Sequence, residues 1–284
     1  MTRIVTAASV LALAGSAFAA IDGQNIPTDA ATDGLTLLAT QDTPTFFGNA
    51  TGGGQDSAGG SELNQLWASI DGNTLNLSIT GNLEANFNKM WIFVDAVAGG
   101  ESTLASDNAD GGYGEINNLA GLGFSGREMD HGLRLEVGGG FYGVNFFDLI
   151  DNTGANVWSG GGPGDLPTGP NAGGSGTTFG WDNSNVDGVD GSSAAGAASA
   201  TKGWEFSIDM TSAFGAAASE VAITAFISNG DGGFLSNQVL PGIGGGDNIG
   251  AGEGAELGFV VIPSPGSAAL LGLGGLAAMR RRRA

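Results

Sequence analysis

The sequence predicts an all-β protein folded as a single antiparallel β-sandwich with long glycine-rich loops. Short runs in which apolar and polar residues alternate recur along the chain, a pattern typical of strands with one buried face. Glycine supplies 54 of the 284 residues and gathers between these runs without a three-residue period, which indicates turns and loops and excludes collagen. Helical periodicity is sparse, and the stretch 20–262 is long enough for one large all-β domain.

The first strands are marked by a hairpin signal and by an apolar run. Residues 66–70 and 74–80 flank Asp71-Gly72, a pair that favours a tight turn between antiparallel strands. One face of the second run carries Leu75, Leu77 and Ile79. Residues 89–95 contain an uninterrupted apolar run, which predicts a central strand covered on both faces.

The second half of the chain carries the remaining strands. We expect strands at 132–137, 141–147, 203–210, 221–228 and 256–262, and short helical segments at 115–119 and 212–220. Residues 159–200 are poor in apolar side chains and rich in Gly, Ser, Asn and Asp, which indicates one long loop or flexible insertion. A loop of that length is unusual in a compact domain, so we expect it to be functional or loosely ordered.

The N-terminal residues 1–19 read as a secretory signal peptide. Arg3 gives a positive start, residues 4–14 are apolar, and Ala17-Phe18-Ala19 places small residues at a cleavage site. We expect signal peptidase to cleave after Ala19; the alternative is a buried N-terminal helix.

The C-terminal residues 263–284 read as a sorting tail. Pro263-Ser264-Pro265 precedes an uncharged stretch, 266–279, and four arginines follow it: Arg280, Arg281, Arg282 and Arg283. As a helix the uncharged stretch would measure about 21 Å, slightly short for a bilayer, which suits a short transmembrane helix held only transiently. The arginines would stay cytoplasmic and leave the domain outside.

This three-part tail resembles the PEP-CTERM sorting signal, in a variant with Pro-Ser-Pro in place of Pro-Glu-Pro. The resemblance implies an exosortase-like membrane protease as partner, cleavage near the proline motif, and delivery to the cell surface or extracellular matrix of a Gram-negative-type bacterium. A plain membrane anchor is the alternative.

Charge sets the class of partner. Outside the two terminal signals, four basic residues stand against 29 acidic ones, a net charge near −25. Such a surface repels nucleic acid and anionic lipid and favours cations, so we expect no nucleic-acid partner. The alternative is that acidity serves solubility alone. The chain has no cysteine, so core burial or bound ions must stabilise it.

The central region carries a second resemblance. It rests on Glu62-Leu63-Asn64, residues 75–84, residues 88–95 and Gly99-Gly100, with weaker likeness at 203–208 and 236–242. These segments are similar to a domain common in PEP-CTERM proteins, which is similar to DOMON-like and family-9 carbohydrate-binding sandwiches. The resemblance implies a jelly-roll-like fold and binding of extracellular polysaccharide, but it transfers no binding residues.

Calcium is the cofactor that the acidic loops favour. Residues 183–188 resemble the opening of a calcium loop, with oxygen-bearing side chains at alternate positions and glycine sixth. Asn183 in place of Asp and Ala194 at position twelve exclude the standard helix-flanked loop. We expect a looser metal site from Asp182, Asp187 and Asp190. Residues 107–112 and 229–233 are similar candidates, with plain turns as the alternative.

Sugar binding requires exposed aromatic rings. Trp67, Trp91 and Trp204 lie in strand patterns, so we expect them in the core. Trp158 and Trp181 flank the glycine-rich loop; together with Tyr113 they are the expected carbohydrate contacts.

The sequence predicts no enzyme. His131 is the only histidine, and we expect it at the surface or in a turn. A single histidine excludes multi-histidine zinc sites, and the absence of cysteine excludes thiol catalysis. No Gly-x-Ser-x-Gly elbow is present. We expect a non-enzymatic surface or matrix protein that associates with polysaccharide. Two alternatives are a self-assembling matrix protein without sugar binding and a secreted glycan hydrolase.

Overall fold

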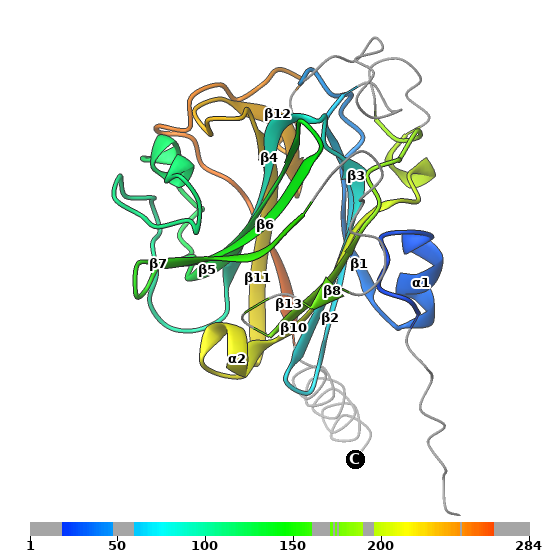
Figure 1. Cartoon of the computed structure of the whole chain (residues 1–284), viewed down its shortest axis with the longest axis horizontal. Helices are drawn as coiled ribbons and strands as arrows, with labels where there is room; N and C mark the ends of the chain where they lie inside the picture. Colours follow the sequence, from blue (N-terminus) through cyan, green and yellow to red (C-terminus); the bar gives the residue numbers. More distant parts are fainter. Residues whose placement is uncertain are drawn as a thin grey trace, which may run out of the picture.

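The computed structural model describes residues 19–47, 60–160, 171–172, 174, 176–189, 196–244 and 246–263. These residues form two antiparallel sheets packed face to face, so the predicted all-β sandwich is confirmed (Figure 1). Sheet A has the strand order β1-β2-β3-β10-β9-β8. Sheet B has the order β12-β11-β4-β5-β6-β7, with β13 paired to β11.

The elements have the following bounds. Sheet A contains β1 (Thr36–Thr40), β2 (Glu62–Asp71), β3 (Thr74–Asn82), β8 (Asn171–Ala172), β9 (Thr177–Trp181) and β10 (Gly203–Asp209). Sheet B contains β4 (Asn86–Asp95), β5 (His131–Gly138), β6 (Phe141–Asp148), β7 (Thr153–Gly160), β11 (Glu220–Ser228), β12 (Leu235–Leu240) and β13 (Val260–Pro263). The helical elements are α1 (Ile26–Thr32), η1 (Glu115–Leu119), η2 (Ala197–Ser199) and α2 (Met210–Phe214).

The main core lies between the sheets, where the inward faces of the alternating strands meet. Sheet A contributes residues such as Leu77, Ile79 and Phe206, and sheet B contributes residues such as Leu133 and Leu135; all are buried. The period-2 alternation of strand side chains explains why these residues share a face while their sequence neighbours do not. The hairpin predicted at Asp71-Gly72 joins β2 to β3, and Gly72 has the positive φ of 59° that this tight turn requires.

Sheet B is buried on both faces at its centre, as the apolar run in β4 predicts. Ile92 points into the main core, whereas Trp91 and Phe93 belong to a second apolar cluster on the outer face of the sheet. In that cluster the ring of Phe93 lies 4.9 Å from Phe124 and 5.8 Å from Phe226, centroid to centroid. The segment that carries η1 covers this face (Figure 1).

Buried amides join the two sheets at the β12 edge. The Gln41 side chain donates to Gln238 Oε1 at 2.7 Å, and the same oxygen accepts the Leu63 backbone N–H at 3.2 Å. Asn237 donates to the carbonyl oxygens of Pro44 and Gly246, each at 2.8 Å. Each of these buried amides has a hydrogen-bond partner, so hydrogen bonds connect the two sheets at this edge.

The long-loop prediction for 159–200 is wrong for part of its length. Within it, β9 pairs with β10 through five residues, from Thr177 to Trp181, and extends sheet A. Its apolar residues, Phe179 and Trp181, are buried. The strand escaped prediction because it is short and the residues before it are rich in glycine. Strands β1, β7 and β12 and helix α1 were also not predicted.

Of the two predicted helical segments, residues 115–119 form the 3-10 turn η1. The segment predicted at 212–220 is helical only at its start, because α2 spans residues 210–214 and shares residues 212–214 with the prediction. Asp209 caps α2 by accepting the Ser212 backbone N–H at 2.8 Å, and Gly215, at φ 75°, ends it.

The two predicted sorting signals lie almost wholly outside the described residues, which begin at Ala19 and end at Pro263. Ala17, Ser264, Pro265 and the four terminal arginines are among the residues outside. Within the described segments, no helix has the length and apolar character that crossing a membrane would require.

We expect Phe93→Ala to lower the free energy of unfolding by about 3–5 kcal/mol, because it leaves a cavity where three aromatic rings meet. Urea denaturation measures the change. Phe46→Ala, at an exposed phenylalanine, is the control and should change it by less than about 0.5 kcal/mol. Similar effects from both variants would contradict a second core on sheet B.

Candidate functional site

Of the three predicted calcium residues, Asp182 is engaged in the protein's own contacts. Asp182 Oδ1 accepts the Ser184 backbone N–H at 2.9 Å and its hydroxyl at 2.6 Å, and Asp182 Oδ2 lies 3.5 Å from Lys202 Nζ. Asp187 is exposed, and Asp190 lies outside the described residues. Among the residues that the structure describes, no group of three His, Cys, Asp or Glu could hold a metal. Calcium therefore stays a prediction of the sequence.

The neighbouring amides of that segment hold the loop to sheet A. Asn183 Oδ1 accepts the Leu83 backbone N–H at 2.8 Å, and Asn183 Nδ2 donates to the Leu83 carbonyl oxygen at 2.6 Å. Asn185 Nδ2 donates to Glu62 Oε1 at 2.8 Å. The alternation of polar residues that suggested a cation loop thus serves side-chain hydrogen bonding.

The three predicted carbohydrate contacts do not form one site. Trp181 is fully buried, with its ring 5.9 Å from Trp204, so it offers no face to a sugar and that prediction is wrong. Burial follows from the pairing of β9 inside sheet A. Trp158, on β7, is half-buried and packs edge-on against Phe179 of the main core. Only Tyr113 is freely exposed, at 95%.

Tyr113 belongs to a depression rimmed by three exposed aromatic side chains. The other two are Phe87, 46% exposed at the start of β4, and Phe141, 38% exposed at the start of β6. The depression has a volume of about 420 Å³ and is also lined by Lys89, Glu115, Glu136 and Gly230. We call it the aromatic depression.

Two glycines make room for the phenylalanine rings of the rim. A Cβ at Gly138 would lie 2.6 Å from the Phe87 ring, and a Cβ at Gly143 would lie 2.9 Å from the Phe141 ring. Phe87 has a φ of 70°, an uncommon backbone conformation for a bulky residue, next to an irregular step in the β4–β5 register. The rim therefore depends on residues from three adjacent strands.

The floor of the depression is an ionic network on the outer face of sheet B. Lys89 Nζ lies 2.7 Å from Glu136 Oε2 and 3.4 Å from Glu115 Oε1. Arg134 pairs with Asp110 at 2.8 Å, with Glu136 at 3.2 Å and with Glu115. Lys89 and Arg134 are almost fully buried, so their charges need these partners.

Asp110 connects this network to the loop that carries Tyr113. Its carboxylate accepts the backbone N–H groups of Gly112 at 2.8 Å, Gly114 at 3.1 Å and Ile116 at 3.2 Å. Burial alone would raise the pKa of Asp110, but Arg134 and these N–H donors outweigh it and lower the pKa. The sequence offered the segment 107–112 as a candidate calcium loop. In the structure its residue Asp110 pairs with the guanidinium group of Arg134 instead.

His131 is buried, so its expected place at the surface or in a turn is wrong. Its Nδ1 lies 2.8 Å from Asp130 Oδ1, and its Nε2 lies 3.5 Å from Asp148 Oδ2. The ring packs 4.9 Å from Phe214, centroid to centroid. The sequence neighbourhood looked like a charged turn because the partners of His131, except for Asp130, are distant in the chain.

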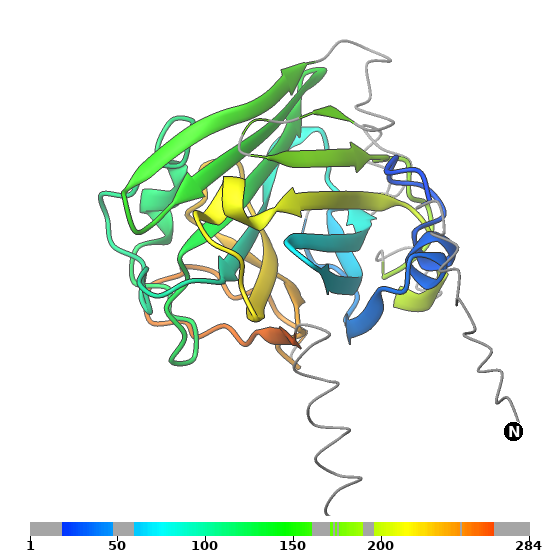
Figure 2. The ribbon, with the colours of Figure 1, turned by 90° about the horizontal axis from the view of Figure 1, so that it is seen from below.

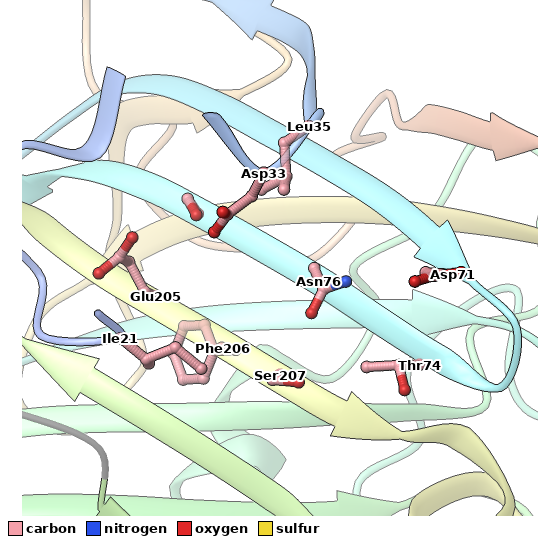
Figure 3. Close-up of a pocket in the computed structure, with 10 residues that line it drawn as sticks. Ile21, Asp33, Leu35, Asp71, Thr74, Asn76, Glu205, Phe206 and Ser207 are labelled. Atoms are coloured by element: carbon pink, nitrogen blue, oxygen red, sulfur yellow. The ribbon is translucent and has the colours of Figure 1, made fainter. Parts of the chain in front are cut away.

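A second concavity lies on the outer face of sheet A (Figure 3). It has a volume of about 240 Å³, and strands β3 and β10 supply its floor. Glu205 lies at one end, where its Oε2 accepts the backbone N–H groups of Asp22 at 2.9 Å and Gly23 at 2.8 Å. We call this concavity the carboxyl groove, because Asp33 and Asp71 also line it.

Glu205 is an acid with an altered affinity for protons. Burial, helped by the nearby charges of Asp29 and Asp22, raises its pKa to about 7, although the N–H donors of Gly23 and Asp22 oppose the shift. The sequence placed Glu205 on the polar face of its strand. It could not reveal the burial, because the segment 21–23 that covers Glu205 is far away in the chain.

The chain matches no family model, no curated protein and no solved structure.

We expect Glu205→Gln to stabilise the protein at alkaline pH and not at acid pH. The unfolded chain ionises near the ordinary glutamate pKa of 4.5, whereas the folded protein ionises near 7, so native stability falls as the pH rises between these values. Glutamine keeps an acceptor for Asp22 and Gly23. The gain should be on the order of 3 kcal/mol at about pH 8 and close to zero at about pH 4.

Urea denaturation at the two pH values measures this difference. Glu128→Gln, at an exposed glutamate, is the control and should change stability little at either pH. A gain for Glu205→Gln that is the same at both pH values would contradict the raised pKa.

Proposed function

We propose that the protein is an exported, non-enzymatic surface or matrix protein that associates with extracellular polysaccharide through the aromatic depression. The observation that carries this proposal is that three exposed aromatic side chains, Tyr113, Phe87 and Phe141, surround a floor of charged side chains. Sugars present apolar C–H faces that pack on aromatic rings and hydroxyl groups that need hydrogen-bond partners. The depression offers both kinds of contact side by side.

The floor supports binding more than catalysis. Glu115 and Glu136 are held in ion pairs with Lys89 and Arg134, so their oxygens are fixed hydrogen-bond acceptors. The arrangement suits the recognition of hydroxyl groups.

The rim supports the same proposal. Backbone conformations such as that of Phe87 cost of order 1–3 kcal/mol in bulky residues and tend to cluster at binding sites. Here the uncommon conformation leaves an aromatic ring almost half exposed, with only part of its surface against Gly138. A sugar on the rim would bury apolar area that the free protein leaves in water.

Export and sorting complete the proposal. The signal peptide would deliver the chain to signal peptidase, and the PEP-CTERM-like tail would deliver it to an exosortase-like protease in a Gram-negative-type envelope. The last described strand, β13, pairs with β11 up to Pro263, so cleavage beyond that residue would leave the paired strand in place. The jelly-roll-like relationship to DOMON-like and family-9 carbohydrate-binding sandwiches belongs to this proposal as well.

We expect Tyr113→Ala and Phe141→Ala each to weaken binding to matrix polysaccharide about tenfold, or about 1.4 kcal/mol, because each removes a stacking surface. Affinity electrophoresis in gels that contain the polysaccharide measures the change. Phe46→Ala removes an exposed ring that does not line the depression and should leave binding unchanged. Absence of binding by the native protein, or equal binding by all variants, would refute the proposal.

We expect the full-length chain to accumulate in the membrane fraction when the exosortase is deleted, and a shorter form to reach the surface when it is present. Replacing Arg280, Arg281, Arg282 and Arg283 with alanine should also block processing, because these charges hold the tail at the cytoplasmic side. Fractionation followed by mass spectrometry of the termini tests both. Soluble cytoplasmic protein with both termini intact would contradict the sorting proposal.

A further inference from the structure

The carboxyl groove is a second polar concavity that the proposed glycan site does not use. Strands β3 and β10 of sheet A line the groove, whereas strands β4, β5 and β6 of sheet B line the aromatic depression together with Tyr113, Glu115 and Gly230. The two sheets lie on opposite sides of the main core (Figures 1 and 2). The two concavities share no lining residue. An inference about the groove therefore stands apart from the proposed function.

Two nearly buried oxygen-bearing groups in the groove lack a complete set of partners. Ser78 is 4% exposed and lines the groove, yet its hydroxyl has no hydrogen-bond partner among the described residues. Glu205 is 6% exposed, and its two backbone hydrogen bonds both go to Oε2, which leaves Oε1 without one in the same part of the chain. Neither oxygen is among the fully enclosed side-chain atoms that lack a partner, so both are open to the groove and available to a polar ligand.

The charge of the groove selects the sign of that ligand. Carboxyl groups of Asp33 and Glu205 lie at one end and that of Asp71 lies at the hairpin end (Figure 3), and no lysine or arginine lines the groove. All four basic residues of the described segments are paired with carboxylates elsewhere: Lys89, Arg127, Arg134 and Lys202. In the exported protein the α-ammonium group of Ala20 would lie one residue from Ile21 of the groove, a single positive charge beside three carboxyl groups, so the groove still favours a cationic group.

Neutral polar groups between the carboxyls indicate what carries the cation. Asn76 and Ser207 line the middle of the groove and Thr74 lies at its hairpin end (Figure 3), and their side chains make no hydrogen bonds within the described residues. Hydroxyl and carboxamide groups donate to and accept from other hydroxyls. A plain polyamine would leave them without partners.

We propose that the carboxyl groove binds a primary ammonium group on a hydroxylated ring, the chemistry of a deacetylated amino sugar. The ammonium group donates to Asp33 and Glu205 and lies against the Ser78 hydroxyl, and the ring hydroxyls meet Asn76 and Ser207. The volume of about 240 Å³ is below the range of drug-sized ligand sites, so the groove holds one sugar residue of a chain.

The test compares glucosamine oligomers with N-acetylated oligomers of the same length. The purified exported protein is titrated by calorimetry near pH 7, where Glu205 is ionised in about half of the molecules and an amine can carry a proton. We expect the amino oligomer to bind at least tenfold more tightly, and we expect this preference to shrink as salt screens the carboxylates. Equal affinities, or no binding of the amino oligomer, would overturn the proposal.

Variants assign the preference to the groove. Ser78→Ala and Glu205→Gln should each reduce it about tenfold, and Asp71→Asn, at the more exposed end of the groove, should reduce it less. Thermal melting shows whether each variant is folded, and Asp71→Asn keeps the test usable if the buried variants are not. A preference that all three leave unchanged would overturn the proposal.

Two controls test whether the amino sugar occupies a different site and whether a polyamine binds equally well. Tyr113→Ala should not change the preference; if it removes the preference instead, the amino sugar binds at the aromatic depression and the groove is not its site. Spermidine has ammonium groups but no hydroxyls and should bind at least tenfold more weakly than the amino oligomer. Spermidine binding of equal strength would overturn the proposal and replace the sugar with a polyamine.

Discussion

The burial of β4 on both faces is the constraint on which the rest of the structure depends. One face of this strand closes the core between the sheets, and the other supports a second apolar cluster around Phe93. That cluster holds the segment that carries η1 against sheet B. Without it, the loop with Tyr113 would have no fixed place beside Phe87 and Phe141.

The ionic network of Lys89 and Arg134 lies on the same outer face of sheet B as the second apolar cluster. Lys89 follows Phe87 on β4, and Arg134 and Glu136 lie on β5, so the strand register itself brings the ionic network together. Asp110 links the network to the turn before η1. Removing Arg134 would leave the buried Asp110 without a cationic partner, and removing Lys89 would leave Arg134 as the one cation for Glu115, Glu136 and Asp110. Breaking a buried ion pair in this way costs more than replacing the whole network with apolar groups. The aromatic depression is therefore built on a part of the fold that tolerates little movement.

The sequence predicted most strands because alternation and the apolar run of β4 are local signals. It failed where pairing with distant residues decides the outcome: Trp181 and His131 are buried by partners that lie far away in the chain. Tyr113 was identified as an exposed aromatic, but Phe87 and Phe141 were not. The space for the Phe87 ring depends on Gly138 in the neighbouring strand β5, a relationship that only the strand register reveals. The space for the Phe141 ring depends on Gly143, two residues further along the same strand.

The most direct test of the account is a crystal structure of the exported protein with an oligosaccharide cut from its own matrix polysaccharide. The account predicts a sugar ring packed against Tyr113 and Phe141, with its hydroxyls within hydrogen-bond distance of Glu115 or Glu136. A sugar bound only elsewhere, with the aromatic depression empty at saturating oligosaccharide, would contradict it.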